Sequence, residues 1–199
     1  MIDADTALAR LVEGNSRYIT GQRQLDSGDA RRQEVAGGQD PFAIVLGCAD
    51  SRVPPEILFD QGLGDLFVIR VAGNVVTPPQ LGSIEFAVES FGTPILVVLG
   101  HSRCGAVSAT LSALQSPQAG GSPNLGSLVE LISPAVEPLL AQDLDADSLI
   151  HEAVRANVHA VTAALSANSA ILAARIASGD LRVIPAEYSL DTGQVELLS

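Results

Sequence analysis

The chain is poor in several residue types whose abundance would define a class of protein. Its 199 residues include two cysteines, one methionine and no tryptophan, and aromatic residues make up only 4% of the total. Two cysteines are too few for the disulfide framework that supports small secreted domains. In a cytoplasmic protein they favour metal binding or catalysis over a disulfide. The context of each cysteine is therefore the first guide to function.

Positive charge is also scarce. The chain has no lysine, its eleven basic residues are all arginine, and its formal net charge is −12. Nucleic acids and anionic membrane surfaces bind through basic patches, so we expect neither as a partner. No apolar run approaches the roughly 20 residues of a membrane span, and the acidic N-terminus, residues 1–5, has no signal-peptide core. We therefore expect a cytoplasmic protein.

Hydrophobic periodicity predicts helices alternating with strands. Short apolar runs predict strands at 42–47, 66–71, 94–100, 181–185 and 194–198. Helical spacing predicts helices at 4–20, 80–91, 105–114 and through most of 128–176, which Pro134 and Pro138 interrupt. Pro54 and Pro55 favour a further helix start, and a turn is expected at Gly73 and Asn74. Polar and glycine-rich composition predicts a linker arm at 21–40 and a loop at 116–127.

This order of elements predicts an α/β fold. The run at 42–47 is apolar at almost every position, which is typical of a strand buried on both faces of a parallel sheet. We expect a mostly parallel central β-sheet flanked by helices, with an N-terminal helical arm. With 47% hydrophobic residues, the chain is long enough for a single domain over residues 1–199, the arm occupying about 1–40.

Three side chains with affinity for zinc follow two of the predicted strands. Cys48 comes directly after the strand at 42–47, His101 follows the strand at 94–100, and Cys104 lies near the start of the next helix. Because functional groups gather at the carboxyl ends of parallel strands, we expect these side chains to meet at one edge of the sheet. A helix N-terminus should lower the pKa of the Cys104 thiol. Two thiolates and one imidazole make a three-ligand zinc site, which leaves a position open for water.

A carboxylate and a guanidinium lie close to the first of these cysteines. Asp50 and Arg52 are near enough in sequence to form a bidentate ion pair. An Asp50 held in this way could accept a proton or hydrogen bond from metal-bound water; released from Arg52, it could instead bind the metal as a fourth ligand and close the site. Zinc with two thiolates and a neutral histidine is formally neutral, so its water should be less acidic than in a three-histidine site. We therefore expect an alkaline activity optimum.

These motifs closely resemble those of the β-class carbonic anhydrases. The matching segments are Cys48–Arg52, Gly100–Gly105, Leu66–Asn74, Ser83–Val88, Gly14–Tyr18 and Ala186–Gly193. The resemblance extends from about residue 6 to residue 196. It implies reversible hydration of CO₂ to bicarbonate and a proton, with zinc-bound hydroxide attacking CO₂. It also implies one Zn²⁺ per chain on Cys48, His101 and Cys104, with Asp50 and Arg52 as a dyad beside the metal-bound water.

The resemblance carries expectations about assembly and the substrate pocket. Family members form homodimers or homotetramers, with active sites at the subunit interface and the N-terminal helix embracing the neighbour. In many members a Gln, a Phe and a Tyr line the CO₂ pocket; the matching positions here are Gln39, Phe67 and Phe86, so phenylalanine replaces the tyrosine. Some members bind inhibitory bicarbonate through a Trp and an Arg. Val45 replaces that Trp although Arg70 is present, so we expect no such site.

Other functions fit parts of the same pattern. An enzyme on this scaffold could act on another linear heterocumulene, such as CS₂ or COS. The chain could instead be a non-catalytic module that binds bicarbonate or zinc, although such a module has less need of Asp50 and Arg52. A thiol redox protein would use Cys48 and Cys104 as a reversible disulfide, and no metal would co-purify with it.

Overall fold

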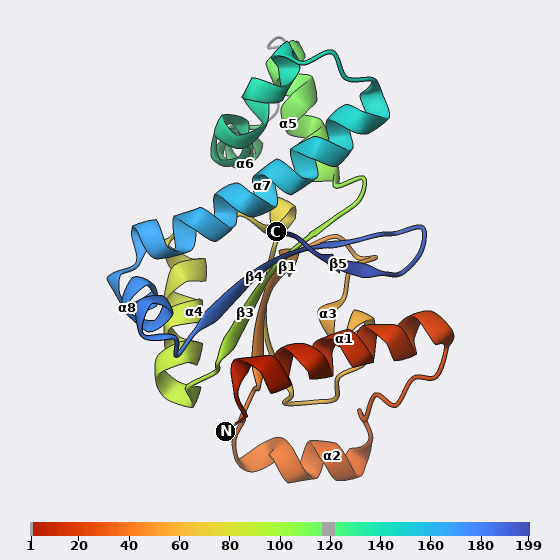
Figure 1. Ribbon diagram of the computed structural model, residues 1–199, viewed down its shortest axis with the longest axis vertical. Helices are drawn as coiled ribbons and strands as arrows, with labels where there is room; N and C mark the ends of the chain where they lie inside the picture. The colour runs from red at the N-terminus through yellow and green to blue at the C-terminus, as the bar shows by residue number, and fades with distance from the viewer. Residues whose placement is uncertain (1, 117–121) are drawn as a thin grey trace.

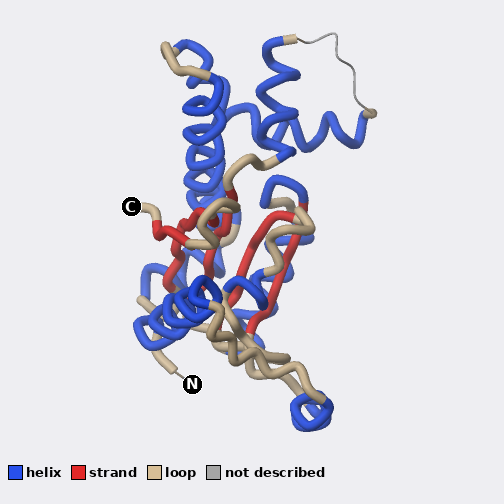
Figure 2. Tube along the Cα trace, turned by 90° about the vertical axis from the view of Figure 1, so that its right-hand side faces the viewer, coloured by secondary structure: helices blue, strands red, loops and turns tan. Residues whose placement is uncertain are grey.

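A five-stranded sheet forms the centre of the molecule (Figures 1 and 2). The computed structural model describes residues 2–116 and 122–199. The strands are β1 (Ala43–Cys48), β2 (Leu66–Val71), β3 (Ile95–His101), β4 (Arg182–Tyr188) and β5 (Val195–Leu197), and their order is β2-β1-β3-β4-β5. All pairings are parallel except that of β4 with β5. The predicted α/β fold with a mostly parallel sheet is confirmed.

Helices cover both faces of this sheet. The helices are α1 (Ala4–Thr20), α2 (Asp29–Glu34), α3 (Pro55–Leu58), α4 (Pro78–Phe91), α5 (Gly105–Gln115), α6 (Pro123–Val136), α7 (Ala146–Asn168) and α8 (Ala170–Ser178), with 3₁₀ turns η1 (Val35–Gly37), η2 (Ala72–Asn74) and η3 (Glu137–Ala141). Helices α1 and α3 pack on one face, and α4, α7 and α8 on the other. Every residue of β1 and β3 is consequently buried, as their apolar sequences predict.

A third apolar cluster lies beyond the carboxyl ends of the strands. Residues from α5, α6 and the first half of α7 pack there around Cys48 and Cys104. Figure 1 shows these helices as a lobe above the sheet, with α7 running from the lobe back across the sheet. The carboxyl edge of the sheet is therefore covered by helices, and the cysteines on it are shielded from solvent.

No single helix in the described part of the chain combines the length and apolar character of a membrane span. Helices α7 and α8 reach that composition only when taken together, across a bend of 100°.

Two predicted loops contain helices. The expected linker arm at 21–40 includes α2 and η1, and the expected loop at 116–127 contains the start of α6; residues 117–121 of that loop lie outside the described residues. Ser122 caps α6 by accepting a hydrogen bond from the Leu125 N–H, and Pro123 occupies the first turn. A serine followed by a proline is a typical helix start, so the sequence contained a signal for the start of α6. Pro134 lies inside α6 rather than ending it.

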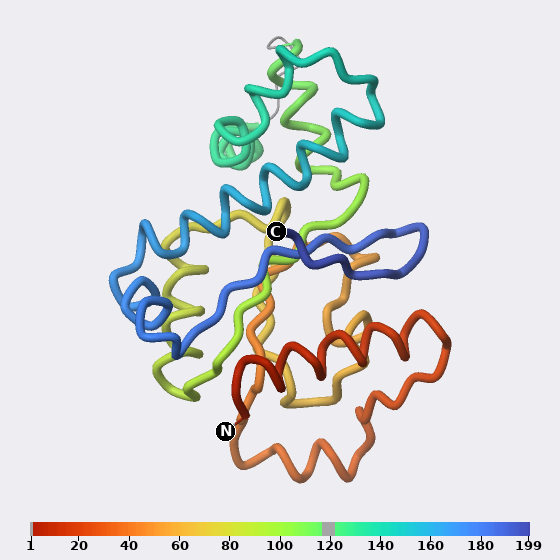
Figure 3. The backbone as a smooth tube through the Cα atoms, in the orientation of Figure 1, coloured from red at the N-terminus to blue at the C-terminus, as the bar shows by residue number. Residues whose placement is uncertain are grey.

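The first helix is fastened to the C-terminal hairpin. The buried Asn15 side chain donates to the carbonyl oxygens of Leu58 and Gly193, at 3.0 and 2.9 Å, and accepts from the Val195 N–H at 2.9 Å. Figure 3 shows α1 in red beside the dark blue hairpin. A Cβ atom at Gly14 would lie 1.8 Å from the Phe59 carbonyl oxygen, so only glycine allows α1 to lie this close to the residue that follows α3. The segment Gly14–Tyr18 therefore joins the two ends of the chain.

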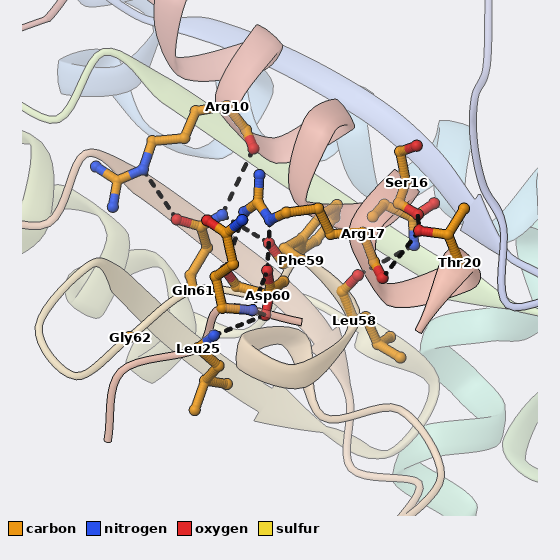
Figure 4. Close-up of polar contacts among 12 residues, drawn as sticks. Arg10, Ser16, Arg17, Thr20, Leu25, Leu58, Phe59, Asp60, Gln61 and Gly62 are labelled. Carbon is orange, nitrogen blue, oxygen red and sulfur yellow. Dashed lines mark hydrogen bonds and ion pairs between the residues drawn. The ribbon is translucent and has the colours of Figure 1, made fainter. Parts of the chain in front are cut away.

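A buried carboxylate fixes the segment that leaves α1 (Figure 4). Arg17 donates to Asp60 at 2.6 Å, and the backbone N–H groups of Gln24 and Leu25 donate to the same carboxylate at 2.9 Å. Burial opposes ionisation of Asp60, but the hydrogen bonds from these three residues outweigh it and hold the pKa of the carboxyl below its usual range. Ionised Asp60 therefore stabilises the folded state.

We expect Asp60→Asn to destabilise the protein by about 3 kcal/mol near neutral pH, because it leaves Arg17 without its charged partner. The pKa of Asp60 is lower in the folded chain, so its contribution is complete above the unfolded value of about 4 and is lost as pH falls through the lower folded value. Denaturant unfolding of both proteins from neutral to acidic pH measures this difference.

The exposed pair of Arg182 and Asp5 provides a control for this measurement. Asp5→Asn should change stability by well under about 1 kcal/mol. A difference between wild type and Asp60→Asn that stays constant down to about pH 2 would contradict the assignment of the stabilising charge to Asp60.

Candidate metal centre

Three buried side chains meet where β1 and β3 end. Cys48 is the last residue of β1, His101 is the last residue of β3, and Cys104 is the N-cap of α5. A single tight turn, in which Arg103 has φ of 54°, connects β3 to α5 and brings Cys104 back towards His101. The parallel arrangement of β1 and β3 thus delivers all three side chains to one edge of the sheet.

The geometry of this cluster suits a tetrahedral metal ion. One ligand atom from each of Cys48, His101 and Cys104 lies within 4.8 Å of the others. The two Sγ atoms are 3.9 Å apart. Two thiolates bound to tetrahedral zinc at about 2.3 Å would be about 3.8 Å apart, so the two cysteines need almost no movement to bind it.

The histidine has a lone pair directed into the cluster. The Nδ1 atom of His101 lies 3.0 Å from the carbonyl oxygen of Ser102 and donates its hydrogen there, which leaves Nε2 as the unprotonated nitrogen. That Nε2 atom is buried and has no hydrogen-bond partner among the described residues. Buried polar atoms are nearly always satisfied, so an unpaired Nε2 beside two thiols is the arrangement expected of a metal ligand.

The two thiols are hydrogen-bonded to each other. With Cys104 as donor, the hydrogen bond between them holds the pKa of Cys48 well below its usual range and raises that of Cys104. The N-terminus of α5 acts on Cys104 in the direction predicted from the sequence, through the N–H groups of Ala106 and Val107, but the Cys48 thiolate outweighs it. A divalent cation bound by both sulfur atoms would displace their protons and balance the charge of both thiolates.

Backbone and arginine groups hold the end of β1 in place. The Gly73 N–H, in η2, donates to Cys48 Sγ at 3.4 Å. Arg70 donates from Nε to the Cys48 carbonyl at 3.0 Å and from its terminal nitrogen to the Asp50 carbonyl at 2.6 Å. The sequence indicated only a turn at Gly73 and offered no signal for these three hydrogen bonds, since all of them depend on the pairing of β1 with β2.

Asp50 and Arg52 form the bidentate pair that their spacing permits. The Arg52 side chain donates to both carboxylate oxygens of Asp50, at 2.9 and 2.7 Å, and the Arg52 backbone N–H donates at 3.0 Å. The Arg52 hydrogen bonds hold the pKa of Asp50 far below its usual range. Asp50 Oδ2 lies 3.9 Å from His101 Nε2. An ionised carboxylate thus stands beside the cluster in a fixed direction.

The structure places the three candidate pocket residues away from this cluster within one chain. Phe67 pairs with Ile44 near the start of β1, whereas Cys48 pairs with Val71. Four residues of strand separate Phe67 from Val71, which corresponds to about 13 Å. Phe86, on α4, packs against Phe67 with ring centroids 6.2 Å apart and is 53% exposed. Gln39 is exposed and precedes β1, so it also lies towards the opposite end of the sheet.

Comparison with known proteins agrees with the geometry. A family model described as carbonic anhydrase matches residues 43–195. Carbonic anhydrase 2 of Mycobacterium tuberculosis is 43% identical over 188 residues, which cover 94% of this chain and 89% of the relative. The solved structure of the β-carbonic anhydrase CcaA has a TM-score of 0.77 and 25% identity, covering 98% of this chain and 92% of that one.

A second solved structure comes from work on two tetrameric β-carbonic anhydrases of the ascomycete Sordaria macrospora. Its TM-score is 0.74 at 28% identity, covering 84% of this chain and 85% of that one. Sequence and fold thus agree over nearly the whole length, including both strands that carry the cysteine and histidine cluster. The chain belongs to the β-carbonic anhydrase family.

Proposed function

We propose that this protein hydrates CO₂ to bicarbonate and a proton, with one Zn²⁺ per chain bound by Cys48, His101 and Cys104. The observation that carries the proposal is the cluster itself: three buried ligand atoms within 4.8 Å, one of them an unpaired imidazole nitrogen. Three protein ligands are typical of catalytic zinc sites. Zinc at such a site acidifies water and so supplies the nucleophile for CO₂.

Asp50 and Arg52 would orient the reacting water. Asp50 is held ionised by Arg52, so it acts as a hydrogen-bond acceptor over the whole physiological pH range. Its Oδ2 atom lies 3.9 Å from His101 Nε2, so the carboxylate lies beside the position that a metal held by Nε2 would occupy. By binding both oxygens, Arg52 also keeps Asp50 from turning towards the cysteines as a fourth ligand. The dyad would therefore keep the site open.

The substrate pocket would be completed by a second chain. Phe67, Phe86 and Gln39 lie too far from Cys48 to line the site of their own chain, and Phe86 is largely exposed. The related Sordaria macrospora enzymes are tetrameric. We infer a homodimer or homotetramer in which these residues face the metal centre of a neighbouring subunit. Phenylalanine at position 86 would give that pocket an apolar wall suited to CO₂.

Stopped-flow CO₂ hydration on zinc-quantified protein tests the proposal. We expect activity with one zinc per chain, and a higher rate at about pH 8.5 than at about pH 7, because two thiolates cancel the charge of the metal and leave water there less acidic than in a three-histidine site. Asp50 is ionised throughout this range, so its protonation does not cause the change.

The other outcomes of this experiment separate the alternatives. Zinc bound without CO₂ hydration at either pH would contradict the proposal and direct the assay to CS₂ and COS. Protein that carries no zinc, and whose activity follows oxidation and reduction of Cys48 and Cys104, would indicate a thiol redox protein instead. Equal rates at both pH values would contradict the expected effect of the thiolates.

A further inference from the structure

Helix α7 carries a buried asparagine in an otherwise apolar face. Asn157 is 1% exposed, and its buried neighbours on the helix are Ala153, Val154, Val158, Val161 and Leu165. Asparagine is a poor residue for a helix interior, and burying its amide is costly unless hydrogen bonds replace those to water. The buried amide of Asn157 must be satisfied by a hydrogen bond inside the protein. Its hydrogen bond therefore calls for a specific explanation.

The side-chain amide of Asn157 donates a hydrogen bond to η2, the turn that also donates a hydrogen bond to Cys48. Asn157 Nδ2 donates to the Gly73 carbonyl oxygen at 2.9 Å, across 84 positions in the sequence. The Gly73 N–H in turn donates to Cys48 Sγ at 3.4 Å. One residue of η2 thus connects a side chain of α7 to a sulfur atom of the metal cluster.

Gly73 is a residue that needs such support. Its φ of 72° lies in the left-handed region, and a Cβ atom there would lie 2.8 Å from Ile132 and 3.1 Å from Ala106. The left-handed backbone conformation therefore favours glycine, and the space around it is tight. Glycine also has the widest choice of backbone conformations, so its own sterics do not hold the N–H towards Cys48. A tertiary hydrogen bond to its carbonyl restricts that freedom.

We propose that Asn157 is a positioning residue of the metal centre, which fixes Gly73 so that its N–H points at Cys48 Sγ. This inference rests on the proposed function, since it assumes that Cys48 binds zinc. Outer groups that orient metal ligands contribute to affinity even though they do not touch the metal. Among the described residues, Asn157 forms its side-chain hydrogen bond with Gly73 and none with Cys48, His101 or Cys104, so it would act through Gly73.

Zinc affinity of Asn157→Leu, measured by competition with a chromophoric chelator, tests the proposal. Leucine fills a similar volume but cannot donate, so we expect zinc to bind about 10-fold more weakly or worse. The matched control is Thr93→Val, which removes another buried hydrogen bond, from Thr93 Oγ1 to the Pro41 carbonyl, at the opposite end of the sheet from Gly73. The control should bind zinc like the wild type.

A second measurement needs no substitution. In wild-type protein loaded with ¹¹³Cd, a hydrogen bond to thiolate transmits a scalar coupling, so the Gly73 amide should correlate with the metal and the Asn157 side-chain amide should exchange slowly with solvent. Asn157→Ala removes the donor, and it should weaken that correlation. These spectra decide the question if Asn157→Leu does not fold.

Equal zinc affinity in Asn157→Leu and Thr93→Val would overturn the inference and leave the proposed function intact. The same holds if wild-type protein binds ¹¹³Cd but shows no Gly73 correlation or a rapidly exchanging Asn157 amide. Wild-type protein that binds neither zinc nor cadmium would overturn the proposed function itself, and this inference with it.

Discussion

Cys104→Ala is expected to remove zinc and CO₂ hydration together. Cys104 supplies one of three ligand atoms, and two remaining ligands from Cys48 and His101 do not make a stable site. We expect zinc affinity to fall by more than the roughly 10- to 100-fold that results from losing an outer supporting group. Metal analysis after dialysis, together with stopped-flow CO₂ hydration, measures both quantities on the same samples.

The fold should survive this substitution. Cys104 is the N-cap of α5 but makes no side-chain capping hydrogen bond, so alanine removes its contact with Cys48 and leaves the helix start without a lost cap. Circular dichroism and thermal unfolding of the variant, compared with wild-type protein stripped of metal, check this point. His151→Ala is the matched control, because His151 lies outside the cluster, on α7, and is half-exposed. Full zinc retention in Cys104→Ala, or loss of zinc in His151→Ala, would contradict the ligand assignment.

The sequence predicted the sheet because the strands are apolar on both faces. β2 spans the predicted residues 66–71, and β1 and β3 differ from their predicted ranges by one residue at each end. Short runs that are apolar at almost every position are typical of buried strands. Since parallel strands place their carboxyl ends at the same edge, the juxtaposition of Cys48 and His101 could be predicted as well.

Contacts between distant elements could not be predicted in the same way. The hydrogen bond from Asn157 to Gly73 depends on how α7 crosses the sheet, which no local pattern encodes. The pKa of Cys104 rises because the Cys48 thiolate lies 3.9 Å away. The predicted lowering of this pKa took account of the helix N-terminus but not of the second cysteine. Phe67 and Phe86 were matched to a pocket by their positions in the sequence, but their distance from Cys48 can be known only from the folded chain.

The second large effect is expected at Asp50. Asp50→Asn should keep zinc, because Asp50 lies outside the Cys48, His101 and Cys104 cluster and forms its hydrogen bonds with Arg52. Turnover should nevertheless fall by roughly 10²- to 10⁴-fold, the range for losing a positioned proton acceptor. Zinc quantification and steady-state CO₂ hydration on one preparation separate the two effects. Asp191→Asn is the matched control, since Asp191 forms an exposed pair with Arg103 near the same edge of the sheet.

Substitution of Arg52 tests whether the loss of turnover is due to Asp50 alone or to the pair of residues. If Arg52 acts by holding Asp50 ionised and turned away from the cysteines, Arg52→Gln loses activity through Asp50, and the double variant is no slower than Asp50→Asn. If the two residues act independently, their effects multiply. Near-normal turnover in zinc-loaded Asp50→Asn would remove the carboxylate from the mechanism, because this substitution removes its charge and its ion pair with Arg52 together. A loss of zinc in the same variant would instead indicate that Asp50 is a metal ligand. The bidentate contact with Arg52 would then compete with metal binding by Asp50.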